Sequence, residues 1–221
     1  MRKFLSVFFL CFALTSMADG GVGPWPTLTP GQSAMAHSFI AMPGSLTPYI
    51  DASMRRDMVD FYAAGSKKGV TNLLMGQSSI DEITDTSFYV SLSSDKSTLS
   101  ARRYQTAKGD TLYAVIATVS VPSPDSSVRF FDSDWNPLEY DAFFTSPRVC
   151  DFAVNPKDKS ARQALEAIPF AFFRLGFTPD GAIAAELSAD YLPDEIKASV
   201  TSHITAAPRL YVWNGKRFVC E

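Results

Sequence analysis

The sequence contains few of the residues from which recognisable catalytic and metal sites are built. Its 221 residues include only two histidines and three cysteines, and no two of these five have the spacing of a zinc site. It has no Gly-x-Ser-x-Gly sequence, which excludes the nucleophile elbow of the α/β-hydrolases. Its N-terminal glycines precede prolines rather than a helix, which excludes a glycine-rich phosphate loop.

The sequence also lacks an excess of charge of one sign. Lys and Arg number 20 against 23 Asp and Glu, for a formal net charge of −3. Nucleic-acid binding depends on Lys and Arg neutralising phosphates, so this balance argues against a nucleic-acid partner. An apolar content of 46% and a charged content of 19% are those of a globular chain, which excludes a largely disordered protein.

Long apolar runs are absent except at the N-terminus. Arg2 and Lys3 precede the apolar run Phe4–Thr15, and small residues follow it at Ser16 and Ala18. A membrane-spanning helix needs about 20 apolar residues, so this shorter run predicts a secretory signal peptide over residues 1–18 rather than an anchor. We therefore expect an exported chain, periplasmic or secreted, with no transmembrane helix after cleavage.

Cleavage after Ala18 leaves two cysteines, Cys150 and Cys220. Export to an oxidising compartment would allow them to form one disulfide. The alternative is that both are small buried apolar residues. The sequence does not decide between the two alternatives, because it does not show whether the Cα atoms of the two cysteines lie within the distance that a disulfide requires.

The mature chain is predicted to begin with an extended leader and to continue as one α+β body. Residues 19–33 are rich in Gly and Pro, which argues against a helix interior. Within the body, residues 34–221, a short helix or turn is expected over Ala36–Ile40. The body offers a possible dividing segment near residues 145–154.

Helical spacing predicts a helix over Ile50–Tyr62. Its inner face carries Ile50, Met54, Met58, Phe61 and Tyr62, and its outer face carries Arg55, Arg56, Asp57 and Asp60. A second helix is predicted over Ser160–Ile168, with Ser160 and Gln163 at capping-box spacing and Pro169 as its stop. A short helix is expected over Leu192–Val200.

Alternating and apolar segments predict antiparallel strands in one or two sheets. Phe88, Val90 and Leu92 alternate with Tyr89, Ser91 and Ser93, which indicates a strand with one face in water. Leu112–Val121 is apolar on both faces, which indicates a central strand. Further strands are expected at Val128–Phe131, Phe170–Phe177 and Ala182–Leu187.

The C-terminus predicts a hairpin, with Leu210–Trp213 and Arg217–Cys220 joined by a type I′ turn at Asn214-Gly215. Residues 210–218 resemble residues 130–138, since both combine aromatic residues with a Trp-Asn turn. Two weakly related halves would explain this likeness. Aromatic residues and Asn also favour hairpins without any repeat.

Three local patterns carry some chemical meaning. His37 and His203 are the two possible histidine bases. Ser93–Lys96 matches Ser-x-x-Lys, but no Lys-Thr-Gly accompanies it, so we interpret it as a polar strand end. Asp132-Ser-Asp134-Trp-Asn136 resembles the start of a calcium loop, but the required Gly and Glu are absent, which excludes an EF-hand. A polar hairpin turn is the default interpretation.

Several short blocks of sequence resemble a known family. They are Met42–Tyr49, Arg56–Tyr62, Val70–Asn72, Thr118–Pro122 and Phe131–Trp135. The family consists of uncharacterised exported proteins from gut-type Gram-negative anaerobes, known only as a domain of unknown function. The resemblance implies no activity, no cofactor and no site residue.

We therefore expect a non-catalytic binding or scaffold module of the cell envelope, with an envelope protein or a glycan as its partner. No catalytic, cofactor-binding or metal-binding residue is assigned. The alternative is an exported hydrolase, in which a histidine meets a serine or carboxylate, or two carboxylates face each other across a cleft. A third hypothesis is part of a calcium- or glycan-linked adhesin.

Overall fold

The computed structural model describes residues 24–93 and 96–221, so the predicted signal peptide lies outside the described residues. The helices are α1 (Pro30–Ala41), α2 (Ala52–Ala63), α3 (Tyr140–Phe143), α4 (Lys159–Glu166) and α5 (Asp194–Val200), with 3-10 turns η1 (Gly44–Leu46) and η2 (Val149–Phe152). The strands are β1 (Val70–Thr71), β2 (Gln77–Ile83), β3 (Ser87–Ser93), β4 (Ser97–Gln105), β5 (Thr111–Val119), β6 (Asp125–Phe131), β7 (Pro137–Leu138), β8 (Phe172–Phe177), β9 (Ile183–Ser188), β10 (Arg209–Trp213) and β11 (Phe218–Cys220).

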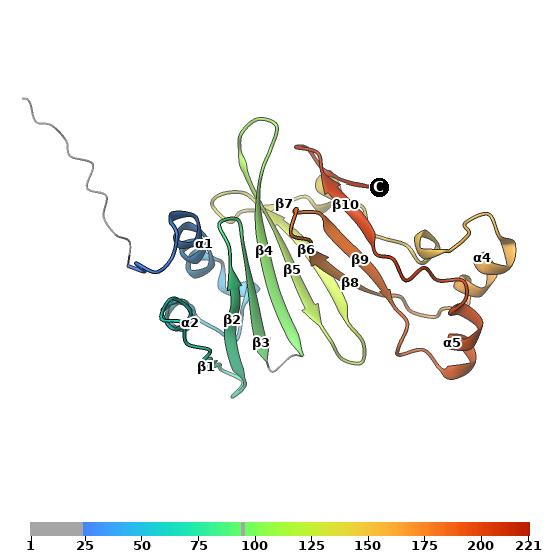
Figure 1. Ribbon diagram of the computed structural model, residues 1–221, viewed down its shortest axis with the longest axis horizontal. Coiled ribbons are helices and arrows are strands. Elements are labelled where there is room, and N and C mark those ends of the chain that lie inside the picture. Colours follow the sequence, from blue (N-terminus) through green and yellow to red (C-terminus); the bar gives the residue numbers. More distant parts are fainter. Residues whose placement is uncertain (1–23, 94–95) are drawn as a thin grey trace, which may run out of the picture.

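The fold is α+β, as predicted, with two antiparallel sheets. β1 to β7 form the first sheet in chain order, and β8 to β11 form the second, also in chain order. Figure 1 shows α1 and α2 beside the first sheet, the second sheet on its other side, and α4 and α5 at the far end. Each neighbouring pair of strands is antiparallel, so short turns suffice to connect them.

The first hydrophobic core lies between the first sheet and the two N-terminal helices. Its largest side chains include Phe39 on α1, Met58 on α2 and Phe88 on β3. Ile50 and Met58 are buried, and Asp57 and Asp60 are exposed, as the helical spacing predicted. These apolar side chains stabilise the sheet by removing one of its faces from water.

Two predictions about this N-terminal part were wrong. Arg55 was assigned to the outer face of α2, but its side chain is buried and donates hydrogen bonds to the carbonyl oxygens of Ile40 and Met42. The predicted leader was too long, because α1 begins at Pro30 with Thr29 as its N-cap in a capping box. Thr29 and a proline at the first helical position are strong start signals.

The second hydrophobic core lies between the two sheets and draws residues from both. Leu112, Ile116 and Phe130 of the first sheet pack with Ile183 and Phe218 of the second. β5 is therefore buried on both faces, which confirms its prediction as a central strand. The segment 145–154, where a division was predicted, lies in the connection between the sheets.

Two details of the second half differ from expectation. The N-cap of α4 is Asp158, whose carboxylate accepts from the Ser160 backbone N–H, so Ser160 lies inside the helix. The C-terminal hairpin is confirmed by the pairing of Trp213 with Phe218. Its turn is not type I′, because Gly215 has a positive φ of 86° whereas Asn214 does not.

Candidate functional site

One face of the first sheet changes from apolar to polar along a row of paired residues. Tyr89 on β3 pairs with Ser100 on β4, Ser100 with Ile116 on β5, and Ile116 with Val128 on β6. Residues directly opposite one another share a face of the sheet. The second sheet covers the Ile116 and Val128 end of this row, and the Tyr89 and Ser100 end opens into a groove.

The groove has a volume of about 1130 Å³ and lies between β2, β3 and β4 on one side and β8 on the other. Its hydroxyl-bearing lining residues are Thr84, Thr86, Ser87, Tyr89, Ser91, Thr98, Ser100, Thr118, Ser120 and Thr178. The remaining lining residues include three acids, two arginines, Phe88 and Phe177. The lining is therefore mostly polar.

The wall formed by β8 is fixed to the first sheet through side chains of β6. The Phe173 N–H donates to Asp125 at 3.2 Å, and the Leu175 N–H donates to the Ser126 hydroxyl at 2.9 Å. These bonds satisfy backbone groups that an edge strand otherwise leaves open to pairing. These two bonds attach β8 to β6, so β8 forms the wall that faces β3 and β4 across the groove.

The acidic side of the groove comes from β2 and the turn that follows it. Asp81 lies at a β-bulge between Ile80 and Glu82, and it accepts a hydrogen bond from the Ser91 hydroxyl at 2.8 Å. A bulge turns a side chain away from the regular alternation of the strand. Glu82 pairs with Tyr89 on β3, and Asp85 follows in the turn, where it accepts from the Thr29 hydroxyl at the start of α1. The lining carboxylates therefore all come from this one side.

The basic side of the groove comes from Arg102 on β4 and Arg174 on β8. The Arg102 guanidinium donates to the carbonyl oxygens of Thr178 at 3.0 Å and Pro179 at 3.1 Å. It therefore ties the end of the groove to the β8–β9 turn. Arg174 lies 3.9 Å from Glu186, an exposed pair of weak interaction energy.

The two histidines lie elsewhere. His37 is exposed on α1, where its ring lies 5.0 Å from the Trp25 ring. His203 follows α5, and its backbone carbonyl accepts from the Val154 N–H. Neither residue belongs to the lining of the groove. Of the Ser93–Lys96 pattern, residues 94 and 95 lie outside the described residues.

The calcium-like segment is a hairpin turn closed by its own side chain. Asp132 accepts from the Asn136 side chain and from the backbone N–H groups of Asp134 and Asn136, each at 2.9 Å. The Asn136 side chain, followed by its backbone N–H, lowers the pKa of Asp132. Both carboxylate oxygens thus serve the turn. Within residues 24–93 and 96–221, no three His, Cys, Asp or Glu residues gather as a metal site would require.

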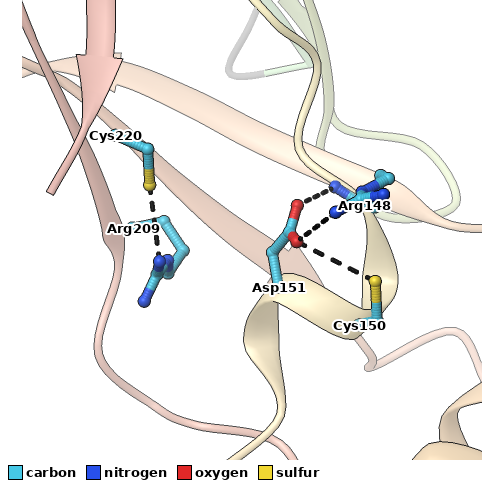
Figure 2. Close-up of polar contacts among 5 residues, drawn as sticks. All are labelled: Arg148, Cys150, Asp151, Arg209 and Cys220. Atoms are coloured by element: carbon cyan, nitrogen blue, oxygen red, sulfur yellow. Dashed lines mark hydrogen bonds and ion pairs between the residues drawn. The ribbon is translucent and has the colours of Figure 1, made fainter. Parts of the chain in front are cut away.

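The two cysteines are free and exposed (Figure 2). Cys150 lies 3.8 Å from Asp151, which pairs with Arg148 at 3.3 Å, and Cys220 accepts from Arg209 at 3.4 Å. The alternative of two small buried residues was wrong, and no disulfide joins them in this structure. Figure 2 shows each sulfur directed to its own neighbour.

Sequence reasoning found one part of the groove and missed the rest. The alternation in β3 predicted that Tyr89 and Ser91 face water. The opposite wall, β8, begins 79 residues after the end of β3, and no local pattern indicates that the two approach each other. An available signal was the run of serines and threonines between residues 84 and 100, which is unusual for strands buried on both faces.

Comparisons with known proteins agree with this fold and assign no activity. A family model described as a protein of unknown function (DUF3256) matches residues 30–218. No curated protein matches the chain. The structure of a domain of an uncharacterized protein from Porphyromonas gingivalis W83 is similar, with a TM-score of 0.68 and 22% identity, over 84% of this chain and 96% of that one. That likeness supports the fold alone. The predicted resemblance to an uncharacterised family is confirmed, and the chain belongs to the DUF3256 family of proteins of unknown function.

Proposed function

We propose that this chain is an exported, non-catalytic binding module of the cell envelope and that the hydroxyl-lined groove is its binding site. The observation that carries the proposal is the open, polar face of β2, β3 and β4 beside the fixed wall of β8. Sites for apolar small molecules are lined mainly by hydrophobic side chains, which this groove is not.

A glycan is the ligand whose chemistry fits this lining best. Sugar hydroxyl groups both donate and accept hydrogen bonds, as serine and threonine hydroxyls do. Asp81 and Glu82 add acceptors on one side, and Arg174 adds donors on the other. The Tyr89 side chain, 40% exposed, offers an aromatic face for the apolar face of a sugar ring.

The non-catalytic part of the proposal rests on where the groove's acids lie. Glycoside hydrolysis uses two carboxyl groups that flank the scissile bond, about 5 to 10 Å apart. Here the lining carboxylates come from one side, and the opposite wall carries Arg174. A bound sugar would therefore meet acceptors on one side and a cation on the other.

Binding of cell-envelope polysaccharides, measured by nuclear magnetic resonance titration or on a glycan array, tests the proposal. We expect Tyr89→Ala and Ser100→Val to weaken binding about tenfold each, as loss of one stacking contact or one hydrogen bond predicts. Tyr49→Ala is the matched control, since Tyr49 is also 40% exposed but does not line the groove. Equal losses in Tyr49→Ala and Tyr89→Ala, or release of a cleaved sugar product, would contradict the proposal.

A further inference from the structure

The turn between β1 and β2 presents three large apolar side chains to solvent. Leu73 and Leu74 are each 62% exposed, and Met75 is 83% exposed. No charged residue occurs anywhere in residues 69–80. Single exposed apolar residues are common on protein surfaces, but three together at the tip of one turn require an explanation.

The turn is held rigidly by Asn72. Its side chain is almost fully buried, with 2% exposure, and its amide donates to the carbonyl oxygen of Leu92 at 2.8 Å. Its side-chain oxygen accepts from the N–H groups of Leu74 at 2.9 Å and Gly76 at 3.0 Å. Met75 has a positive φ of 61°, a backbone conformation that few non-glycine residues adopt. The backbone that presents the exposed side chains is therefore held in one conformation by contacts within the protein.

All backbone N–H groups of the turn already have acceptors within the protein. Besides the two on Asn72 Oδ1, the Asn72 N–H donates to Gly76, the Leu73 N–H to Tyr49 and the Met75 N–H to Asn72. A segment that enters hydrocarbon must satisfy these groups internally, because lipid offers no hydrogen-bond partners. The turn can leave water without losing a backbone hydrogen bond at any of these five donors.

A second apolar turn lies at the same end of the sheet. Antiparallel order places the β1–β2 and β5–β6 connections at the same end of the sheet, as Figure 1 shows. Val119 and Val121 flank the start of the β5–β6 connection and are 55% and 60% exposed. The exposed Lys96, just before β4, lies between these two turns, and its carbonyl oxygen accepts from the Ser120 N–H. A lysine in this position can keep its ammonium at the level of the headgroups while its apolar stem lies deeper.

We infer that this apolar end of the first sheet inserts into the interfacial layer of a lipid bilayer. The exposed side chains project from separate turns rather than line a groove, and a fluid surface accommodates such projections without a matching pocket. Tyr49, whose carbonyl oxygen accepts from Leu73, is half exposed beside the turn, and tyrosine is favoured at the level of lipid headgroups. Without residues 1–18 the chain has 18 Lys and Arg against 23 Asp and Glu, a net charge of −5, which makes zwitterionic lipid the expected surface. The inference does not depend on the groove.

Flotation with phosphatidylcholine vesicles tests it, using the chain without residues 1–18, because the apolar run Phe4–Thr15 would itself bind lipid. All described residues are retained. We expect this chain to float with the vesicles and the double variant Leu74→Ser, Met75→Ser to partition about a hundredfold less. Val154→Ser is the matched control, since Val154 is also 62% exposed but lies beside the end of α5, where its N–H donates to the carbonyl oxygen of His203, and it should float unchanged.

A second measurement reports position rather than affinity. In Leu74→Trp, the added indole should be quenched by brominated phosphatidylcholine more strongly than the tryptophans of the unaltered chain. Failure of the unaltered chain to float, or quenching no greater than in that chain, would overturn the inference. So would equal flotation of the double variant, or a loss in Val154→Ser as large as in the double variant. Binding of the turn to a protein without vesicle binding would assign this surface to a protein partner instead.

Discussion

The guanidinium of Arg55 on α2 donates a hydrogen bond of 2.8 Å to the carbonyl oxygen of Met42, just beyond the end of α1. It also donates to the carbonyl oxygen of Ile40 at 2.9 Å and to the Thr47 hydroxyl at 2.7 Å. Burial lowers the pKa of Arg55, and Asp51 partly opposes this effect. The arginine thus joins the end of α1, the following loop and α2 through backbone acceptors.

We expect Arg55→Met to lower the free energy of unfolding by about 3 kcal/mol, because buried carbonyl groups would lose their donors. Urea unfolding followed by circular dichroism measures the change. Arg56→Met is the control, since Arg56 is exposed on the same helix and should change stability by no more than about 0.5 kcal/mol. Similar values for the two variants would show that the Arg55 contacts contribute little.

The packing of α2 leads to a second expectation. Met58 is 1% exposed in the first core, so Met58→Ala should destabilise the protein by roughly 2 to 5 kcal/mol through lost contacts and a cavity. Asp57→Ala, one residue away and exposed, should be nearly neutral. Chemical denaturation of both variants measures this, and wild-type stability in Met58→Ala would remove Met58 from the core.

These two neighbouring sites show what local patterns predict well. Apolar spacing placed Met58 correctly, because burying an apolar side chain is favourable whatever it meets. The same reasoning placed Arg55 outside, because burying a charge is unfavourable unless partners meet it. Those partners are carbonyl oxygens at residues 40 and 42, and nothing in a helical pattern reveals where they lie.

The strands show the same difference between features that a local pattern predicts and features that depend on distant segments. The faces of β3 and β5 were predictable, since period-two alternation and a doubly apolar run are properties of the segments themselves. The groove was not, because it requires β8 to approach β3 and β4 across a long connection. The exposed turn at Leu73–Met75 has neither helical nor strand periodicity, so the sequence predicted nothing about its apolar residues.

The C-terminal hairpin yields a test of its corrected turn. Asn214 accepts from the backbone N–H groups of Lys216 and Arg217, both at 2.9 Å, and only Gly215 has a positive φ. Gly215→Val should therefore destabilise by about 1 to 2 kcal/mol through backbone strain. Asn214→Asp should be tolerated because it keeps the acceptor, and Asn214→Gly should be destabilising. In a type I′ turn glycine would be favourable at that position, so a stabilised Asn214→Gly would contradict this geometry.

Stability should also fall at alkaline pH. Burial between the sheets raises the pKa of Tyr211 from 10.0 to about 12, with smaller contributions from Cys220 and Asp151. A raised folded-state pKa stabilises the fold fully below the unfolded value of about 10, and this contribution is lost as the pH rises toward 12. Thermal unfolding of Tyr211→Phe between pH 9 and 12 should show a smaller loss than the unaltered chain. An identical loss would exclude Tyr211 as a cause.

The export that we propose makes a prediction about the start of the mature chain. Trp25 is 4% exposed, and its indole N–H donates to Asp60 at 2.6 Å, so the mature protein needs this residue. Cleavage after Ala18 retains it and yields a chain that begins at Asp19. Intact mass measured on protein expressed in a Gram-negative host should show the loss of residues 1–18. Ala18→Lys should block cleavage, because the processing site requires a small residue, whereas Ala13→Leu, within the apolar run, should be processed normally. A chain that keeps Met1 in the cytoplasm, or one cut after Trp25, would contradict the signal peptide as assigned.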